Sequence, residues 1–182
     1  MSSSLKELNL NDHKNWVISD LILKQAKKFP KFNIIEFIDN EKWTYEDILS
    51  KGLKASFRLK KNGLTNGDSI VVMIDNPKVF IPIWLGACFL GITFVALNTA
   101  LRGDVLKHQI EISKPKLIIT ENIYFKYFKK NHNNIDFLAL DRDLEAVKNS
   151  PYSHDVQHYS FSKIKEYLEN NKKQEKEKQL QK

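Results

Sequence analysis

The chain has 182 residues, of which 42% are hydrophobic and 28% charged, and its formal net charge is +7. This size and composition are typical of a single globular domain. The only cysteine, Cys88, excludes an internal disulfide and indicates a reducing compartment. Residues 1–11 contain no basic segment followed by an apolar one, so we predict no secretory signal and a cytoplasmic location.

The positive charge does not indicate a nucleic-acid partner. Lysines are spread over predicted helix faces and over the tail 163–182, where glutamates accompany them. No basic stripe with interleaved aromatic residues is visible. We predict a solvated lysine-rich surface and no nucleic-acid binding.

The first elements are short. Residues 1–13 are polar, and we predict a flexible N-terminus. Helical spacing of apolar residues then predicts a helix over Trp16–Lys28. The segments Ile34–Ile38 and Lys42–Tyr45 alternate like strands and are separated by a polar turn, which predicts a hairpin.

A longer helix is predicted to follow the hairpin. Thr44 is a good N-cap residue, and Asp47 stands three positions later as its capping-box partner. Gly63 is predicted to end this helix after a basic last turn. One face is expected to carry the apolar or small residues Ile48, Leu49, Leu53, Ser56 and Phe57.

Helices and strands alternate through the next 70 or so residues. Ile70–Ile74 is apolar at every position, which predicts a parallel strand covered on both faces. The later elements are a helix from Pro77 to about Leu90, a strand Thr93–Leu97, a helix Gly103–Lys114, a strand Leu117–Ile119, a short helix Asn122–Lys130 and a strand Phe137–Leu140. This order predicts an α/β layered domain with a mostly parallel sheet and flanking helices.

Residues 79–101 contain no charged side chain, so a membrane-spanning helix is an alternative for this run. Pro82, Gly86 and Gly91 interrupt the run, and Thr93-Phe94-Val95 favours a strand. We therefore predict a buried helix, a turn at Gly91 and a strand.

Two pairs of polar residues are candidate sites. His154 and His158 are four residues apart, but two ligands do not make a metal site, so we predict two exposed histidines and no bound metal. Asp141 and Asp143 follow an apolar strand, where solvated carboxylates are the simpler interpretation.

Several short motifs occur in a characteristic order. They are Trp43-Thr44-Tyr45-Glu46-Asp47, Asn66-Gly67-Asp68, Asn76-Pro77, Leu90-Gly91, Leu97-Asn98-Thr99, Arg102-Gly103-Asp104, His108 and Lys116-Leu117-Ile118-Ile119-Thr120. Their order and spacing resemble the N-terminal segment of the AMP-binding, or adenylate-forming, acyl-CoA synthetases. The resemblance covers roughly residues 14–145.

The block Asn98–His108 looks most like carnitine/crotonobetaine-type CoA ligases and the fatty-acid-transport type of acyl-CoA synthetase. Many relatives have Asn-Pro-Arg-Leu here, with arginine at the place of Ala100. This departure leaves the subfamily and the acyl substrate open.

The resemblance implies a two-step reaction. A carboxylic acid attacks the α-phosphorus of ATP, with Mg²⁺ neutralising charge, and the CoA thiol then displaces AMP from the acyl-adenylate. The groups that do this lie in later family motifs, so no catalytic residue is carried over to this chain. In some relatives, positions after the Asn-Thr block approach the CoA phosphates, which makes Arg102 and Lys107 candidates for CoA contact.

The family's phosphate-binding loop requires glycines, and this sequence has none after Gly103. We therefore expect a fragment of an acyl-CoA ligase that is inactive alone and binds no cofactor itself. The alternatives are a non-catalytic interaction module derived from such a ligase, and a small membrane protein anchored through residues 79–101.

The resemblance also sets the domain boundaries that we expect. Residues 14–145 would form a partial ligase domain, 146–170 an irregular connection and 171–182 a charged tail that is disordered or helical. If layers of the ligase are missing, apolar strands would be exposed, and the chain would self-associate through that surface.

Overall fold

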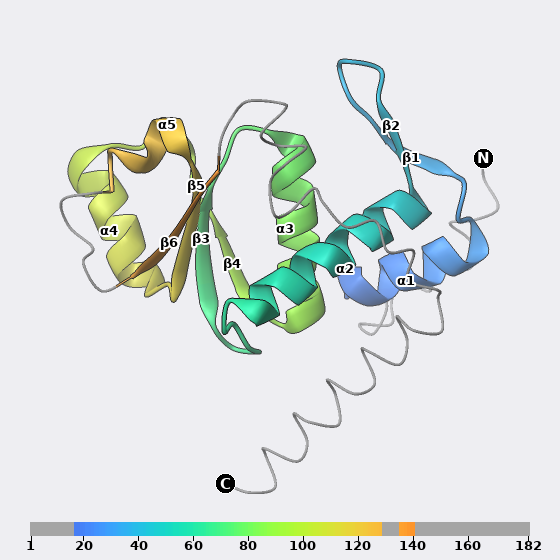
Figure 1. Cartoon of the computed structure of the whole chain (residues 1–182), viewed down its shortest axis with the longest axis horizontal. Coiled ribbons are helices and arrows are strands. Elements are labelled where there is room, and N and C mark those ends of the chain that lie inside the picture. The colour runs from blue at the N-terminus through green and yellow to red at the C-terminus, as the bar shows by residue number, and fades with distance from the viewer. Residues whose placement is uncertain (1–16, 129–134, 141–182) are drawn as a thin grey trace, which may run out of the picture. The chain divides into compact units, whose positions relative to one another are not determined.

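A computed structural model describes residues 17–128 and 135–140. The described residues fall into two compact units, residues 17–50 and residues 51–128 with 135–140. The predicted termini 1–13, 146–170 and 171–182 lie outside the described residues, as do His154, His158, Asp141 and Asp143. Figure 1 gives the order of the elements along the chain.

The first unit contains a helix and a hairpin. Helix α1 (Ile18–Lys28) buries Ile22 and Ala26. Strands β1 (Asn33–Glu36) and β2 (Lys42–Thr44) pair antiparallel, and the turn between them places Asn40 in the left-handed region with φ 64°. The hairpin predicted from the sequence is therefore confirmed.

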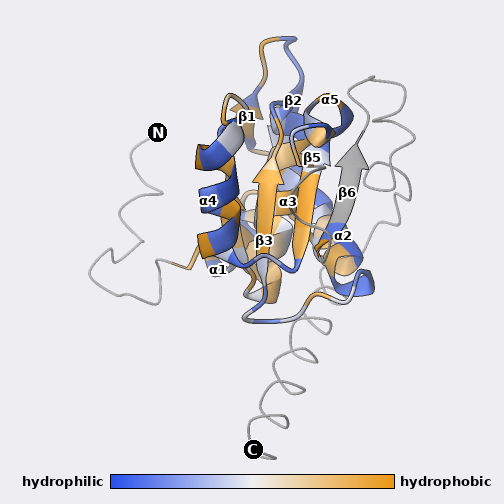
Figure 2. Cartoon of the chain, turned by 90° about the vertical axis from the view of Figure 1, so that its left-hand side faces the viewer, coloured by the Kyte–Doolittle hydropathy of each residue, from blue (hydrophilic) through white to orange (hydrophobic). Residues whose placement is uncertain are grey.

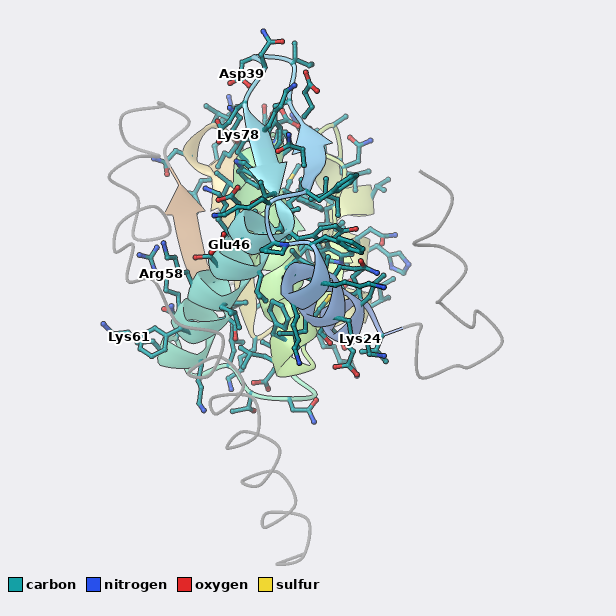
Figure 3. The ribbon with its side chains drawn as sticks, turned by 90° about the vertical axis from the view of Figure 1, so that its right-hand side faces the viewer. Lys24, Asp39, Glu46, Arg58, Lys61 and Lys78 are labelled. Atoms are coloured by element: carbon teal, nitrogen blue, oxygen red, sulfur yellow. The ribbon has the colours of Figure 1, made fainter. Side chains whose placement is uncertain are left out.

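Helix α2 (Tyr45–Lys61) begins with the predicted capping box and runs from the first unit into the second. The Asp47 backbone N–H donates to Thr44 Oγ1 at 3.2 Å, and the Thr44 backbone N–H donates to Asp47 Oδ2 at 2.9 Å. These two bonds satisfy donors that a helix start would otherwise leave without partners. Arg58 and Lys61 extend from the last turns of the helix (Figure 3).

The predicted buried face of α2 needs one correction. Ile48, Leu49, Leu53 and Ser56 are buried, as expected, but Phe57 is 53% exposed. The buried positions are centred near Gly52, and a residue five positions further along a helix points about 140° away from it. The prediction that Phe57 lies on the buried face is therefore wrong.

The second unit is built on a four-stranded sheet in which every pair is parallel. The strands are β3 (Ser69–Met73), β4 (Thr93–Ala96), β5 (Leu117–Glu121) and β6 (Asp136–Leu140). Their order across the sheet is β4-β3-β5-β6. This confirms the predicted parallel α/β class.

Helices cover both faces of the sheet. Helix α3 (Pro77–Leu90) lies on one side, and α4 (Gly103–Ser113) and the short α5 (Asn122–Phe125) lie on the other (Figure 1). Two separate apolar clusters result, one containing Ile70 and Val72 and the other Val71 and Met73. Alternate side chains of one strand thus reach opposite cores, as the pleat requires.

β3 and β5 are hydrophobic over nearly their whole length (Figure 2) and are buried at every apolar position. The expectation that missing layers would leave these strands exposed is wrong for β3 and β5, because helices of the chain itself cover them. β4 differs because it is an edge strand, and its Phe94 and Val95 are half-buried.

The uncharged run 79–101 has the predicted structure. α3 ends at Leu90, Gly91 adopts a left-handed conformation with φ 67°, and the chain returns as β4. Glycine suits this position because it has no Cβ to clash at positive φ. No helix among the described residues is long and apolar enough to cross a bilayer. Anchoring through a single helix over 79–101 is therefore contradicted.

Candidate binding site at the carboxyl edge of the sheet

The topology of the sheet indicates a candidate site at its carboxyl edge, the side on which all four parallel strands end. The chain leaves β3 through α3 to reach β4 on one flank, and then crosses back through α4 to reach β5 on the other flank. The direction of winding therefore changes between β3 and β5. In open parallel sheets, ligands bind outside the carboxyl ends of the strands at such a switch point.

Asp75, just after β3, links three segments at this edge. Thr99 Oγ1, in the loop after β4, donates to Asp75 Oδ1 at 2.6 Å. The Tyr124 hydroxyl in α5 donates to Asp75 Oδ2. The Asp75 backbone N–H donates to Glu121 Oε2, at the end of β5, at 3.3 Å. The carboxyl ends of β3, β4 and β5 are thus tied together by one aspartate.

Arg102, one of the two predicted CoA-contact residues, lies beside this cluster. It occupies the N-cap position of α4 with an extended backbone. Its Nη1 donates to the backbone oxygens of Thr99 at 2.5 Å and Leu101 at 2.7 Å. Its guanidinium carbon lies 3.7 Å from the ring centroid of Tyr127 and 5.9 Å from that of Tyr124. A guanidinium over an aromatic face at these distances is a cation–π contact.

This arrangement changes the acidity of the Tyr127 phenol. A hydrogen bond with Arg102 lowers its pKa below the usual value of 10. Desolvation opposes that change, and the positive charges of Arg102 and Lys126 add to it. The Lys126 Nζ lies 5.1 Å from the Tyr127 ring centroid. The phenolate form is favoured because two cations surround it.

Lys107, the other predicted CoA-contact residue, has a different environment. It is exposed on α4, and its Nζ lies 3.8 Å from Glu111 Oε1, one helical turn further on. A surface pair of this kind contributes little to stability. Arg102 is thus the N-cap of α4 and Lys107 lies within the same helix, but the contacts given above for the two side chains are with different residues.

Sequence reasoning missed Asp75 and Tyr127. Asp75 directly follows an apolar strand, so the rule for strand ends in parallel sheets could have found it. Tyr127 carries no such signal, because its role comes from the proximity of Arg102, 25 positions earlier.

Two observations concern the ATP and Mg²⁺ that the family uses. Residues 104–182 contain no glycine for a phosphate-binding loop. Among residues 17–128 and 135–140, no three His, Cys, Asp or Glu side chains are grouped so that they could hold a metal ion.

Comparisons with curated proteins identify relatives. The chain is 33% identical over 142 residues to a 2-succinylbenzoate–CoA ligase of Bacillus licheniformis, a match that covers 78% of this chain and 27% of the relative. It is 30% identical over 111 residues to a long-chain-fatty-acid–CoA ligase of Bacillus subtilis, covering 61% and 20%. It is 28% identical over 103 residues to long-chain fatty acid transport protein 6 of Mus musculus, covering 56% and 16%. The chain thus spans about a quarter or less of the length of these relatives.

Solved structures share the fold. A Mycobacterium tuberculosis fatty acyl CoA synthetase matches with a TM-score of 0.66 and 17% identity, over 82% of this chain and 31% of that chain. The inhibitor-bound N-terminal domain of FACL13 from the same organism matches with a TM-score of 0.65 and 16% identity, over 79% and 37%. At these identities the likeness concerns the fold alone.

A family model for "AMP-binding enzyme" matches residues 22–182, which is most of the chain. The relatives include acyl-CoA ligases, and the parallel sheet with helices on both faces is the fold of the structural neighbours. The chain therefore belongs to the AMP-binding enzyme family and corresponds to the N-terminal segment of its members.

Proposed function

We propose that this chain contributes the N-terminal part of an ATP-dependent acyl-CoA ligase. The observation that carries the proposal is the family match over residues 22–182, supported by relatives that are CoA ligases. The whole protein would join a carboxylic acid to CoA through an acyl-adenylate, releasing pyrophosphate and then AMP. It would use ATP, Mg²⁺ and CoA. The named relatives act on different acids, so the acyl substrate stays open.

Within this role, Arg102 and Lys107 contact the phosphates of CoA, and the chain 1–182 itself provides this contact, in place of the expectation that it binds no cofactor alone. Arg102 lies at the carboxyl edge, near the switch point, and both side chains are exposed. Phosphate oxygens form short, strong hydrogen bonds with guanidinium and ammonium groups. The partial positive charge at the start of α4 favours an anion in the same place.

The CoA contact is tested with 3′,5′-ADP, the nucleotide half of CoA, titrated into the chain 1–182 by calorimetry. Arg102→Ala is expected to weaken binding by about tenfold, because a hydrogen bond to a charged group contributes about 1.5–3 kcal/mol. Lys107→Ala is expected to weaken it by about twofold to threefold, in line with a solvated charge. Lys61→Ala, at the end of α2, is the matched control for net charge. Equal affinities for the Arg102→Ala variant and the unmodified chain would refute this contact.

We also propose that the chain 1–182 alone does not adenylate a carboxylic acid. The reason is the absence of glycine after Gly103, which leaves no phosphate cradle in this sequence. The test is a pyrophosphate-release assay with purified protein, ATP, Mg²⁺ and a panel of acids that includes fatty acids, 2-succinylbenzoate and crotonobetaine. Release above the no-enzyme background would contradict the proposal.

A second candidate function is a non-catalytic interaction module. One observation favours it: the central strands β3 and β5 are covered on both faces by this chain's own helices. A monomer that melts cooperatively above about 60 °C would support a self-sufficient core. Aggregation or dye binding would instead support self-association through exposed apolar surface. The domain boundaries at residues 14 and 145 and the cytoplasmic location stay predictions.

A further inference from the structure

The contact between Arg102 and Tyr127 carries an inference about how the proposed phosphate site is built. Arg102 is exposed, and a free arginine on a surface samples many rotamers. Here two backbone oxygens and one aromatic ring hold its guanidinium. The side chain is therefore ordered before any ligand arrives, which lowers the entropy cost of binding.

The donors of Arg102 can be counted. A guanidinium has five N–H donors, and two of them are on Nη1. Both Nη1 hydrogens have backbone acceptors, on Thr99 and Leu101. The N–H groups of Nε and Nη2 are left for other acceptors. These groups form the planar fork that suits two oxygens of one phosphate.

We propose that Tyr127 is a positioning residue for Arg102: its neutral ring holds the guanidinium for a phosphate ligand, and its phenolate competes with that phosphate. This inference rests on the proposed function, because the phosphate in question is that of CoA. The chemistry needs no covalent step. Loss of the phenol proton places a negative charge against Arg102, which then has less attraction for a second anion.

The direction of the pH dependence follows from the groups around the phenol. Arg102 and Lys126 face the Tyr127 ring, and Tyr124, whose hydroxyl donates to Asp75, has its ring centroid 5.9 Å from the guanidinium carbon of Arg102. The pKa of Tyr127 is lowered from 10, so the phenolate forms at a lower pH than in an ordinary tyrosine. Phosphate affinity is therefore present at pH 7 and lost as the pH rises through this lowered pKa. Lys126 also places a positive charge beside the ring, so the role of the tyrosine must be tested by substitution.

The experiment measures 3′,5′-ADP binding to the chain 1–182 at pH 7.0 and pH 9.5. This probe carries the phosphates of CoA without its thiol, which would itself titrate in this range. The unmodified chain is expected to bind more weakly at pH 9.5 than at pH 7.0, by at most about tenfold, the loss of one charge-assisted contact. Tyr127→Phe keeps the ring and removes the ionisable hydroxyl. At pH 7.0 its affinity should equal that of the unmodified chain within about twofold, and raising the pH to 9.5 should weaken its binding much less.

Two further variants separate positioning from a general structural effect. Tyr127→Ala removes the ring, and we expect affinity at pH 7.0 to fall by about fivefold because Arg102 is no longer held. Tyr45→Phe, in the first unit, removes a hydroxyl elsewhere and should leave the pH dependence unchanged. Circular dichroism and the denaturant midpoint of each variant confirm that it is folded.

The outcomes distinguish the two proposals. A fall in affinity at pH 9.5 that is the same in Tyr127→Phe as in the unmodified chain would overturn the role of Tyr127 and leave the CoA contact standing. Full affinity in Arg102→Ala would overturn the CoA contact itself. No binding of 3′,5′-ADP by the unmodified chain would overturn both.

Discussion

The two helices that cover the sheet of residues 51–140 are built differently. α3 has no charged residue after Lys78 and is buried at Ile83, Leu85, Gly86, Ala87, Phe89 and Leu90. α4 buries only Leu106 and Ile110, and it leaves Val105 and Ile112 more than half exposed. Figure 2 shows the mixture of hydrophilic and hydrophobic residues on α4.

Contacts with a second helix explain the difference. α3 lies between the sheet and α2, and glycines let the two helices approach closely. A Cβ on Gly86 would lie 2.6 Å from the Ser56 backbone nitrogen, and one on Gly52 would lie 2.9 Å from Leu85 Cβ. Within residues 51–128 and 135–140, α4 has no such covering helix. The candidate binding residue Arg102 is on the α4 side, where a side chain can face a ligand without disturbing the packing.

The largest effect on stability is expected from the removal of a core side chain on the α4 side. Leu106 is 2% exposed, and Leu106→Ala is expected to lower the free energy of unfolding by about 3 kcal/mol through lost burial and a cavity. Val105→Ala, at the neighbouring exposed position, should change it by less than about 0.5 kcal/mol. Urea denaturation measures both. Similar losses for the two variants would show that α4 is covered on its outer face too.

Gly86→Ala tests the close approach of α2 and α3. The added methyl group meets backbone atoms that cannot rotate away, so we expect a loss of about 2 kcal/mol from overpacking. Gly103→Ala on the α4 side is the matched control. Gly103 has φ 55° and no atom within 4 Å of an added Cβ, so only backbone strain of about 1 kcal/mol is expected. If the control variant is the less stable of the two, close helix packing is not what distinguishes the two sides.

Asp68→Asn tests an ion pair at the amino ends of the sheet strands. There the side chain of Asp68, in the turn before β3, contacts Lys116, just before β5. The Asp68 carboxylate accepts from the Thr65 backbone N–H at 2.6 Å and from Lys116 Nζ at 3.0 Å. Partial burial raises the pKa of Asp68, but the hydrogen bonds from Thr65 and Lys116 outweigh it, and the net pKa is lowered. A lowered pKa means that the stabilisation is present above the unfolded-state value, about 3.9, and disappears as the pH falls through the folded-state value.

We therefore expect Asp68→Asn to lose about 1 kcal/mol at pH 7 and much less near pH 3. Urea midpoints at the two pH values give the comparison. The double variant Asp68→Asn/Lys116→Gln should lose less than the sum of the two single variants, because both changes remove the same ion pair. A loss that does not depend on pH would mean that the charge of Asp68 is not what stabilises this edge.

The smallest effect is expected at Ser56, and it has the opposite sign. Ser56 is fully buried in α2, and its Oγ has no hydrogen-bond partner within the part of the chain that the structure describes. Ser56→Ala should be neutral or stabilise by up to about 1 kcal/mol. Ser113→Ala on α4 is the contrast, since the Ser113 hydroxyl donates to the Gln109 oxygen at 2.5 Å, and its loss should cost about 0.5 kcal/mol. A destabilised Ser56→Ala variant would indicate that this hydroxyl has a partner after all.

Local chemistry explains the predictions that were confirmed. The capping box at Thr44 and Asp47, the left-handed glycine at Gly91 and the apolar strand at Ile70–Ile74 are each readable over a few residues. The conformations involved depend on side chains a short distance along the chain. The family motifs are readable for the same reason, since each is short and they occur in a fixed order.

Only the tertiary structure decided the features that depend on distant residues. The order β4-β3-β5-β6 sets the switch point, and it follows from which face each crossover helix covers. The exposure of Phe57 and the burial of β3 and β5 depend on which neighbours pack against each element. The contact of Arg102 with Tyr127 joins residues 25 positions apart, in different loops. Periodicity and propensity describe one segment at a time, so they contain no information about which segments meet.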